Sequence, residues 1–488
     1  MSSSSPNVAV IGGGITGLAT AFYLRKLRPN ARITLFEGGS RLGGNIRTER
    51  REQFVVDAGP DSFIAGKPAA LELCRELGLA GELIRPRPGA RRVYVARDGR
   101  LQAVPEGLVM GVPTRLGPLL RSGFLTLSGK LRMLAEAFIP RGFGRGSADV
   151  GDESIEAFMT RRFGKEAALR FVAPLLAGIY AGDADRLSMD ATFPLLSALE
   201  AQHGSVTWGL LLAQLARVSG AASGTRFARA KAALHWLKAV PGEGQESPFV
   251  SLRSGMGTLI STLAGRLGET RVLIGQKVDS VQRAGDGWSV FASGNRLDVD
   301  AVVLAPPAHV AANLLAPGAL SDELRAIRYA STATVFFGFD QRTLARPLIG
   351  AGFIVPPGEG SVLAGTWITS KWEDRAPDGS VLVRAFLGGA RAEKDVTQED
   401  DQSLVARSLS ELERLAGKLG TPRFTSVHRH IASNPQPSLG HRARIARIDA
   451  ALVGLPGLHL AGAAYDGVSI PDCVRQARAA AERVAGAA

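Results

Sequence analysis

The chain has 488 residues, 45% of them hydrophobic and 21% charged, a composition typical of globular proteins that excludes wholesale disorder. At roughly 100–200 residues per domain, this length predicts two to four domains. The 58 Lys and Arg residues outnumber the 45 Asp and Glu residues, so the formal net charge is +13. Such an excess favours anionic partners: nucleic acid, anionic lipid, or a ligand that carries carboxylates or phosphates.

Cysteine and histidine usage limits the site chemistry. Two cysteines, Cys74 and Cys473, are too few for a disulfide framework or a Cys-rich metal site, and they favour a reducing compartment. The seven histidines show no metal-ligand spacing. The N-terminus has no signal-peptide pattern, and the long uncharged stretch 301–321 is interrupted by prolines, so we expect no membrane-crossing segment.

The first forty residues predict a strand–helix–strand unit. An apolar run, 8–11, leads into a glycine turn, a helical pattern covers 18–27, and a second strand, 33–37, ends at Glu37. In the G-x-G-x-x-G pattern, Gly12 allows the tight turn, Gly14 lets the backbone approach a pyrophosphate, and Gly17 packs the helix on the strand. Glu37 follows Gly17 by 20 residues, the spacing at which a carboxylate accepts from a ribose hydroxyl. The segment therefore predicts a dinucleotide site.

Two further features favour FAD over NAD. A second glycine turn, Arg41-Leu42-Gly43-Gly44-Asn45, follows Glu37 closely and resembles the Arg-x-Gly-Gly element of flavoprotein oxidases. A late strand ends in another glycine at Gly462. A one-domain NAD enzyme needs neither element.

The rest of the chain contains further predicted strands and helices, together with two stretches that are both basic and apolar. Strands are expected at 272–274, 278–281, 288–291 and 302–305, an antiparallel sheet between 330 and 390, and helices over 401–417 and 472–486. Two stretches, 107–135 and 201–240, combine cations and large apolar residues with no Asp or Glu. Because the nucleotide-binding pattern occurs at the start, middle and end, we expect one domain assembled from three segments.

A specific family resemblance lies in two blocks. Residues 178–183 (GIYAGD), with 187–189 (LSM) and 192–194 (TFP), form the first, and 460–468 (LAGAAYDGV), with Asp472 and Cys473, form the second. The chain resembles, from Val8 to its C-terminus, the oxygen-dependent protoporphyrinogen oxidases of the amine oxidase/phytoene desaturase flavoprotein superfamily.

This resemblance implies a mixed α/β architecture in three units. A Rossmann-like FAD-binding domain would comprise residues 1–75, 250–310 and 430–488. An antiparallel-sheet substrate domain would comprise 76–106 and 311–429. A mainly helical insertion would cover 107–249, contribute to the substrate pocket and contact the membrane surface.

The resemblance also implies site residues. Contacts to FAD would come from Gly12, Gly13, Gly14, Ile15, Thr16, Gly17, Glu37, Gly38, Gly43, Gly44, Asn45, Gly59, Pro60, Asp61, Ser62, Val278, Ala463, Val468, Ser469 and Ile470. A substrate propionate would be held by Arg91 or Arg92, between which the sequence does not choose. The tetrapyrrole would lie against Gly178, Gly352, Ile354 and Phe386, with Ala351 departing from the Phe usual in the family.

The implied reaction is a six-electron oxidation of protoporphyrinogen IX to protoporphyrin IX. Three two-electron steps transfer hydride to a non-covalent flavin, and oxygen is reduced to three hydrogen peroxide molecules. No catalytic side chain is assigned, because the cofactor supplies the chemistry. Cys473 is expected to be a buried thiol rather than a flavin attachment point.

Several alternatives stay open from the sequence. Coproporphyrinogen III is an alternative substrate, a flavin amine oxidase of the same fold is an alternative enzyme, and a non-enzymatic FAD protein is a third reading. We expect peripheral contact with anionic lipid at the inner face of the cell membrane, a cytoplasmic location and no nucleic-acid partner. The sequence leaves open whether the chain forms a homodimer.

Overall fold

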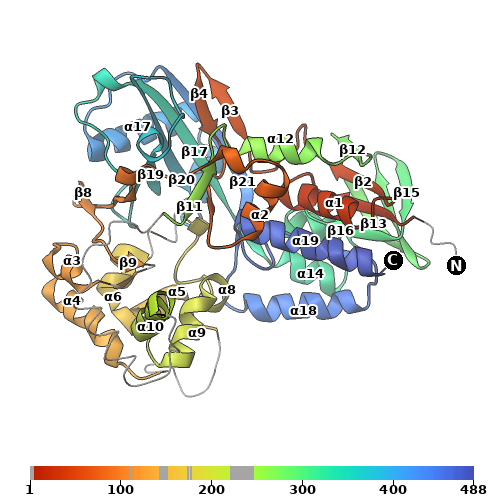
Figure 1. The fold of residues 1–488 in the computed structure, drawn as a ribbon, viewed down its shortest axis with the longest axis horizontal. Coiled ribbons are helices and arrows are strands. Elements are labelled where there is room, and N and C mark those ends of the chain that lie inside the picture. Colours follow the sequence, from red (N-terminus) through yellow and green to blue (C-terminus); the bar gives the residue numbers. More distant parts are fainter. Residues whose placement is uncertain are drawn as a thin grey trace.

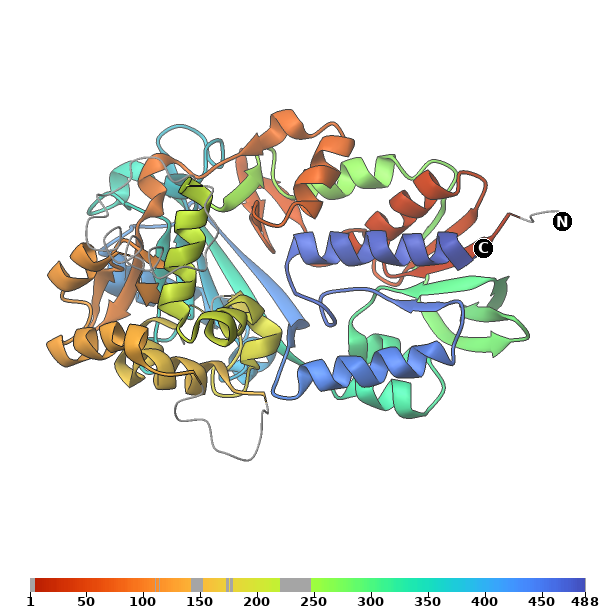
Figure 2. The same cartoon turned by 60° about the horizontal axis from the view of Figure 1, so that its bottom comes forward.

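The computed structural model describes residues 5–109, 111–113, 115–141, 152–172, 175, 179–219 and 247–487. A parallel sheet with its helices, a long antiparallel sheet and a group of short helices form three neighbouring parts (Figure 1). The two long strands β17 (Arg328–Asp340) and β21 (Phe424–Gln436) run between the first part and the second, as Figure 2 shows.

Five parallel strands form the nucleotide-binding sheet, in the order β12-β2-β1-β16-β22. Their segments come from three separate parts of the chain: β1 (Asn7–Ile11), β2 (Arg32–Glu37), β12 (Arg271–Ile274), β16 (Ala301–Leu304) and β22 (Leu458–Leu460). The side chains of β16 are all buried, as expected where both faces of a sheet are covered. Helices α1 (Ile15–Leu27) and α19 (Ile470–Ala487) share one apolar core with this sheet.

The opposite face of the parallel sheet is covered by a small sheet and three helices. These elements share a second core: β13 (Val278–Ala284), β14 (Gly287–Ala292), β15 (Asn295–Val299), α13 (Ala308–Leu314), α14 (Ala319–Arg325) and α18 (His441–Val453). The structure thus confirms the strands expected between 272 and 305.

The second large sheet has seven strands in the order β21-β17-β20-β19-β18-β7-β8. Its pairs are antiparallel except β18 with β7. The remaining strands are β20 (Ser380–Gly388), β19 (Ala364–Trp367), β18 (Gly352–Ile354), β7 (Val93–Arg97) and β8 (Arg100–Ala103). Helix α17 (Asp401–Ala416) packs on one face, so the antiparallel sheet and the helix expected from the sequence are both present. Residues 430–436, which the sequence analysis placed in the FAD-binding unit, continue β21 of this sheet.

The insertion is mainly helical in its described part. It contains α3 (Leu116–Arg121), α4 (Leu127–Leu134), η3 (Ala135–Phe138), α5 (Ile155–Phe163), α6 (Lys165–Ala167), η4 (Ala168–Val172), α8 (Met189–Thr192), α9 (Pro194–His203) and α10 (Val206–Ser219), with the short pair β9 (Leu108–Val109) and β10 (Val112–Pro113). Glu136 and Arg162 form a fully buried ion pair inside it, and Glu136 Oε1 accepts from the N–H of Val206 at 3.0 Å, at the start of α10. No helix within the described ranges is both long and apolar enough to cross a bilayer.

Shorter elements connect these parts. They are β3 (Thr48–Arg51), β4 (Phe54–Asp57), β5 (Phe63–Ile64), α2 (Ala69–Glu76), η1 (Ala80–Glu82), β6 (Leu83–Ile84), η2 (Pro88–Arg91), β11 (Phe249–Leu252), α12 (Gly257–Gly265), η5 (Gln341–Thr343), α15 (Ile368–Lys371) and α16 (Glu393–Gln398).

Candidate active site

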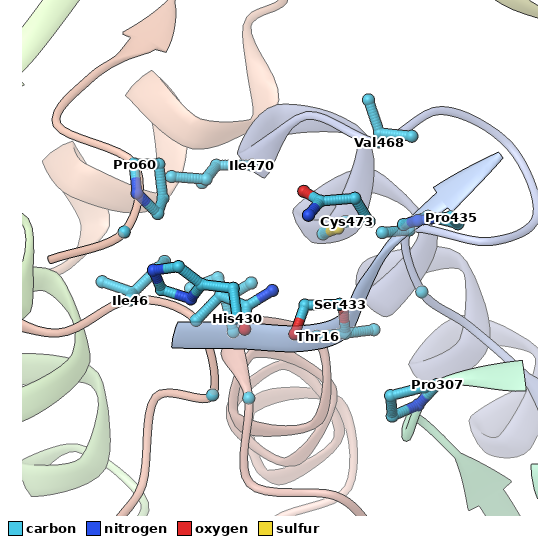
Figure 3. Close-up of a pocket in the computed structure, with 18 of the residues that line it drawn as sticks. Thr16, Ile46, Pro60, Pro307, His430, Ser433, Pro435, Val468, Ile470 and Cys473 are labelled. Carbon is cyan, nitrogen blue, oxygen red and sulfur yellow. The ribbon is translucent and has the colours of Figure 1, made fainter. Parts of the chain in front are cut away.

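A cavity of about 850 Å³ lies where the parallel sheet meets the seven-stranded sheet. Its walls come from the first glycine turn, the residues after β2, the segment 59–64, the start of α19, and strands β17, β20 and β21. Figure 3 shows Ile470 and Val468 on one side of this space and His430 and Ser433 on the opposite side. The volume is near the upper end of the range for small-molecule sites.

The glycine turn has the geometry that a dinucleotide requires. Gly12 has a φ of +105°, which a side chain rarely adopts, and it ends β1 in a tight turn. A Cβ on Gly14 would meet no atom within 4 Å, so this position opens into the cavity. The N-cap residue of α1, Gly14, has no side chain that could cap the helix, so the first amides of α1 can face an anion. The turn therefore fits a pyrophosphate.

The Glu37 carboxylate connects the end of β2 to this turn. Its Oε2 accepts from the N–H of Gly13 at 2.7 Å and its Oε1 from the N–H of Gly39 at 2.6 Å. Each oxygen keeps a further lone pair, and Glu37 lines the cavity, so acceptor capacity for ribose hydroxyls is present.

The second glycine turn is stabilised by its own arginine. The guanidinium of Arg41 donates to the carbonyl oxygens of Leu42, Gly44 and Ile46 at 2.5–3.1 Å. Gly43 and Gly44, both with positive φ, and Asn45 line the cavity. In this structure Arg41 therefore shapes the turn, and the turn backbone faces the ligand space.

Eighteen of the twenty cofactor residues expected from the sequence line this one cavity. The exceptions are Gly13, whose N–H binds Glu37, and Gly17, which packs against Gly12. The Glu37 carboxylate, the open position at Gly14 and the N-terminus of α1 together fit FAD. Their individual contacts to the cofactor stay predictions.

The residues expected to bind substrate, unlike those expected to bind the cofactor, do not all line this cavity. Phe386 lines the cavity, whereas Gly352 and Ile354 do not. A Cβ on Gly352 would lie 2.1 Å from the carbonyl oxygen of Gly365, so that glycine allows β18 and β19 to approach closely. Ile354 is buried in the apolar core that the sheet shares with the helical insertion. Gly178 lies outside the described residues, although Ile179, Tyr180 and Ala181 line the cavity.

Arg91 and Arg92 are exposed at the entry to β7 and are not among the residues that line the cavity. The backbone carbonyl of Arg92 accepts from the N–H of Ala351 at 2.8 Å. Their contact with a propionate stays a prediction.

Sequence reasoning missed a polar floor on the seven-stranded sheet. Alternate residues of three adjacent strands face the cavity, namely Thr332, Thr334, Arg384 and His430, beside the expected Phe386. The Arg384 guanidinium carbon lies 4.3 Å from the centre of the Phe386 ring. The only sequence signal for these residues is strand alternation, which does not reveal which face meets the cavity.

His430 and Asp61 have displaced pKa values. His430 Nε2 bonds to the carbonyl oxygen of Ala58 at 3.0 Å, which makes that nitrogen the donor, and burial lowers the pKa of His430. Burial raises the pKa of Asp61, but the charges of Lys371 and Arg384 outweigh it and hold the pKa well below its usual range. Near neutral pH the histidine is therefore neutral and the carboxyl ionised.

The Cys473 thiol also lies in the cavity wall (Figure 3). Burial raises the pKa of this thiol to about 11, which keeps it protonated and a weak nucleophile.

Comparison with known proteins identifies the family. A family model described as flavin containing amine oxidoreductase matches residues 15–485. The chain belongs to this family. Among its relatives, the coproporphyrinogen III oxidase of Bacillus subtilis (strain 168) is 34% identical over 487 residues and covers 98% of each chain. The protoporphyrinogen oxidase of Bos taurus is 32% identical over 505 residues, again covering 98% of each.

A solved structure agrees. A protein of Exiguobacterium sp. 255-15, assigned as a protoporphyrinogen oxidase, is 31% identical, with a TM-score of 0.83 over 99% of both chains. The protein is thus a flavin-dependent oxidoreductase of the protoporphyrinogen oxidase group, as the sequence resemblance predicted.

Proposed function

We propose that this flavoprotein oxidises a porphyrinogen to a porphyrin, with non-covalent FAD as cofactor and oxygen as acceptor. The observation that carries the proposal is the composition of this cavity. Its lining joins the dinucleotide turn to Phe386, Tyr180 and a buried guanidinium, Arg384. Bound flavin would supply the two-electron chemistry, while the chain's residues bind, orient and shield the substrate.

Arg384 argues against the amine oxidase alternative. It is 4% exposed and lies in the cavity wall, so an ammonium substrate would be brought close to a buried cation. An amine site is better served by aromatic faces without a competing charge. A substrate with carboxylate side chains meets no such repulsion.

Coproporphyrinogen III is our first candidate substrate. It carries four propionates, against two in protoporphyrinogen IX, and suits a chain with a net charge of +13. The similarity to the Bacillus subtilis coproporphyrinogen III oxidase supports the same choice. Protoporphyrinogen IX, which the sequence analysis favoured, becomes the second candidate.

The test is turnover by the purified, flavin-loaded protein. We expect porphyrin fluorescence to rise with either porphyrinogen, with a higher kcat/KM for coproporphyrinogen III and three hydrogen peroxide molecules per porphyrin. Benzylamine and putrescine serve as amine substrates. Peroxide release with an amine, and none with either porphyrinogen, would refute the proposal.

The mode of flavin attachment is tested separately. Because Cys473 is held protonated, we expect acid precipitation to leave all the flavin in the supernatant as intact FAD. Flavin that stays with the precipitated chain would show a covalent link.

We further propose that the helical insertion contacts the inner face of the cell membrane. Leu120, Leu127, Leu131 and Phe138 are 49–81% exposed on neighbouring short helices. The cations Arg121 and Lys130 lie among them. Such a surface suits the interface of an anionic bilayer. Of the second stretch, 201–240, residues 220–240 lie outside the described residues.

A further inference from the structure

Five charged residues form a network at the cavity wall and behind it: Asp57, Asp61, Arg375 and Arg384, which are buried, and Lys371, which is partly exposed. Arg375 Nη1 lies 3.2 Å from Asp57 Oδ2, and Lys371 Nζ lies 3.1 Å from Asp61 Oδ2. Arg384 Nη2 is 3.5 Å from the same Asp61 oxygen. Three cations therefore share two carboxylates, and one positive charge is in excess.

Arg384 is the cation of this network that borders the cavity. Its side chain lines the cavity, whereas those of Lys371 and Arg375 do not. Its Nη1 donates to the carbonyl oxygen of Gly59 at 2.8 Å, but no described residue accepts from its buried Nε.

The carboxylate nearest to Arg384 is already engaged by other donors. Asp61 accepts from Lys371, from Trp372 Nε1 at 3.0 Å and from Ser62 Oγ at 2.8 Å. A guanidinium stays protonated in proteins even when burial lowers its pKa, as it does for Arg384. A buried cation without a full counter-charge is costly, and an anion placed beside it is correspondingly stabilised.

The position of Arg384 links the two predicted halves of the site. It holds the carbonyl of Gly59, in the segment expected beside the flavin. It also shares one face of β20 with Phe386, the expected substrate wall, because side chains two residues apart point to the same face. If the flavin and the substrate lie at these expected positions, Arg384 lies between them.

We propose that Arg384 is an electrostatic positioning residue, whose guanidinium stabilises the negative charge that a two-electron reduction leaves in the cavity. A hydride carries two electrons and one proton, so a neutral acceptor that takes it gains one negative charge. The substrate's second proton leaves separately, and oxygen later removes the two electrons as hydrogen peroxide. The inference rests on the flavin chemistry of the proposed function and is independent of which porphyrinogen is used.

The test is the midpoint potential of the bound flavin, measured without porphyrinogen by slow reduction with xanthine and xanthine oxidase against a reference dye. In Arg384→Met the equilibrium constant for reduction should fall about tenfold to hundredfold. A tenfold change in a two-electron couple corresponds to about 30 mV. Arg384→Lys, which keeps the charge, should recover most of the wild-type potential.

Asp61→Asn gives the opposite prediction and does not depend on the stability of the Arg384 variants. Removing a carboxylate increases the excess positive charge, so the potential should rise. Arg346→Gln is the matched control: Arg346 Nη2 donates to the carbonyl oxygen of Leu415 at 2.8 Å outside the cavity lining, and its loss should leave the potential unchanged.

An unchanged potential in folded, flavin-loaded Arg384→Met, or a fall in Asp61→Asn, would overturn the inference. Failure of the proposed function is seen differently, as absence of porphyrinogen turnover in the wild type. The two failures are therefore distinguishable.

Discussion

A Cβ atom placed on Gly17 would lie 1.8 Å from the carbonyl oxygen of Gly12. Helix α1 therefore rests directly on the end of β1, with no room for a side chain between them. Gly14, three residues earlier, is the reverse case, because its Cβ would enter open space in the cavity. Two glycines of one motif thus have separable duties, one in packing and one in ligand access.

Substitution at these glycines should separate folding from cofactor binding. Gly14→Val is expected to lose bound FAD, because its methyl groups occupy the pyrophosphate space, and to melt near the temperature of the flavin-free wild type. Gly17→Ala forces the helix off the strand, and overpacking of this kind typically costs about 1–3 kcal/mol or more. Flavin absorbance and thermal unfolding measure the two effects. Retention of full FAD occupancy in Gly14→Val would contradict the placement of the pyrophosphate.

Membrane contact should depend on the apolar side chains of α4. We expect the wild type to float with phosphatidylglycerol vesicles, more strongly at low salt than at high salt because screening weakens the attraction of the cations. Leu127→Ser with Leu131→Ser should lose most of the binding that survives high salt. Val453→Ser is the control, since Val453 is 82% exposed at the end of α18, outside this surface. Wild-type protein that stays unbound at both salt concentrations would refute the prediction.

The buried Glu136–Arg162 pair should matter far more for stability than a surface pair. Both side chains are fully buried, and Glu136 also accepts from Ser205 Oγ at 2.8 Å and the Thr207 N–H at 3.1 Å. Arg162→Met leaves that carboxylate without its cation, a change that typically costs about 3–5 kcal/mol.

The matched control for this pair is Asp322→Ala on α14. Asp322 forms an exposed pair with Arg325, and such pairs contribute about 0–1 kcal/mol. Urea unfolding of both variants gives the comparison. Equal losses would show that the buried network does not stabilise the insertion.

Stability should fall between pH 6.5 and 4 because of buried histidines. Burial lowers the pKa of both His428 and His459 to about 4, so they stay neutral in the folded chain while the unfolded chain takes up protons near pH 6.5. Their contribution is therefore complete above pH 6.5 and is lost as the pH falls toward 4, with a slope of up to ~1.4 kcal/mol per pH unit for each histidine.

The His428→Gln, His459→Gln double variant tests this assignment. Its free energy of unfolding, measured in urea at pH 7 and pH 5, should change less with pH than that of the wild type. Equal pH dependence in the two proteins would assign the effect to other groups.

The amino-acid sequence by itself determined the local parts of this protein. The strand–glycine–helix unit and Glu37 could be predicted from spacing, because a turn and its flanking elements depend on neighbouring residues. The roles of the Arg41–Asn45 turn and of the late segment around Ala463 came from resemblance to known flavoproteins. The alternation of strands also revealed the antiparallel sheet. The placement of Phe386 in a pocket came from family resemblance rather than from pattern.

Only the tertiary structure decided which distant residues share the cavity. Arg384, His430 and Thr334 face it because the register of β17 with β20 and β21 turns their alternate side chains to one side. Lys371 becomes part of the charged network because α15 brings it to Asp61, 310 residues earlier in the chain. Sequence spacing carries no information about register between strands that lie far apart in the chain. For the same reason the sequence could not show that Arg91 and Arg92 are exposed, while the cavity's buried guanidinium belongs to Arg384.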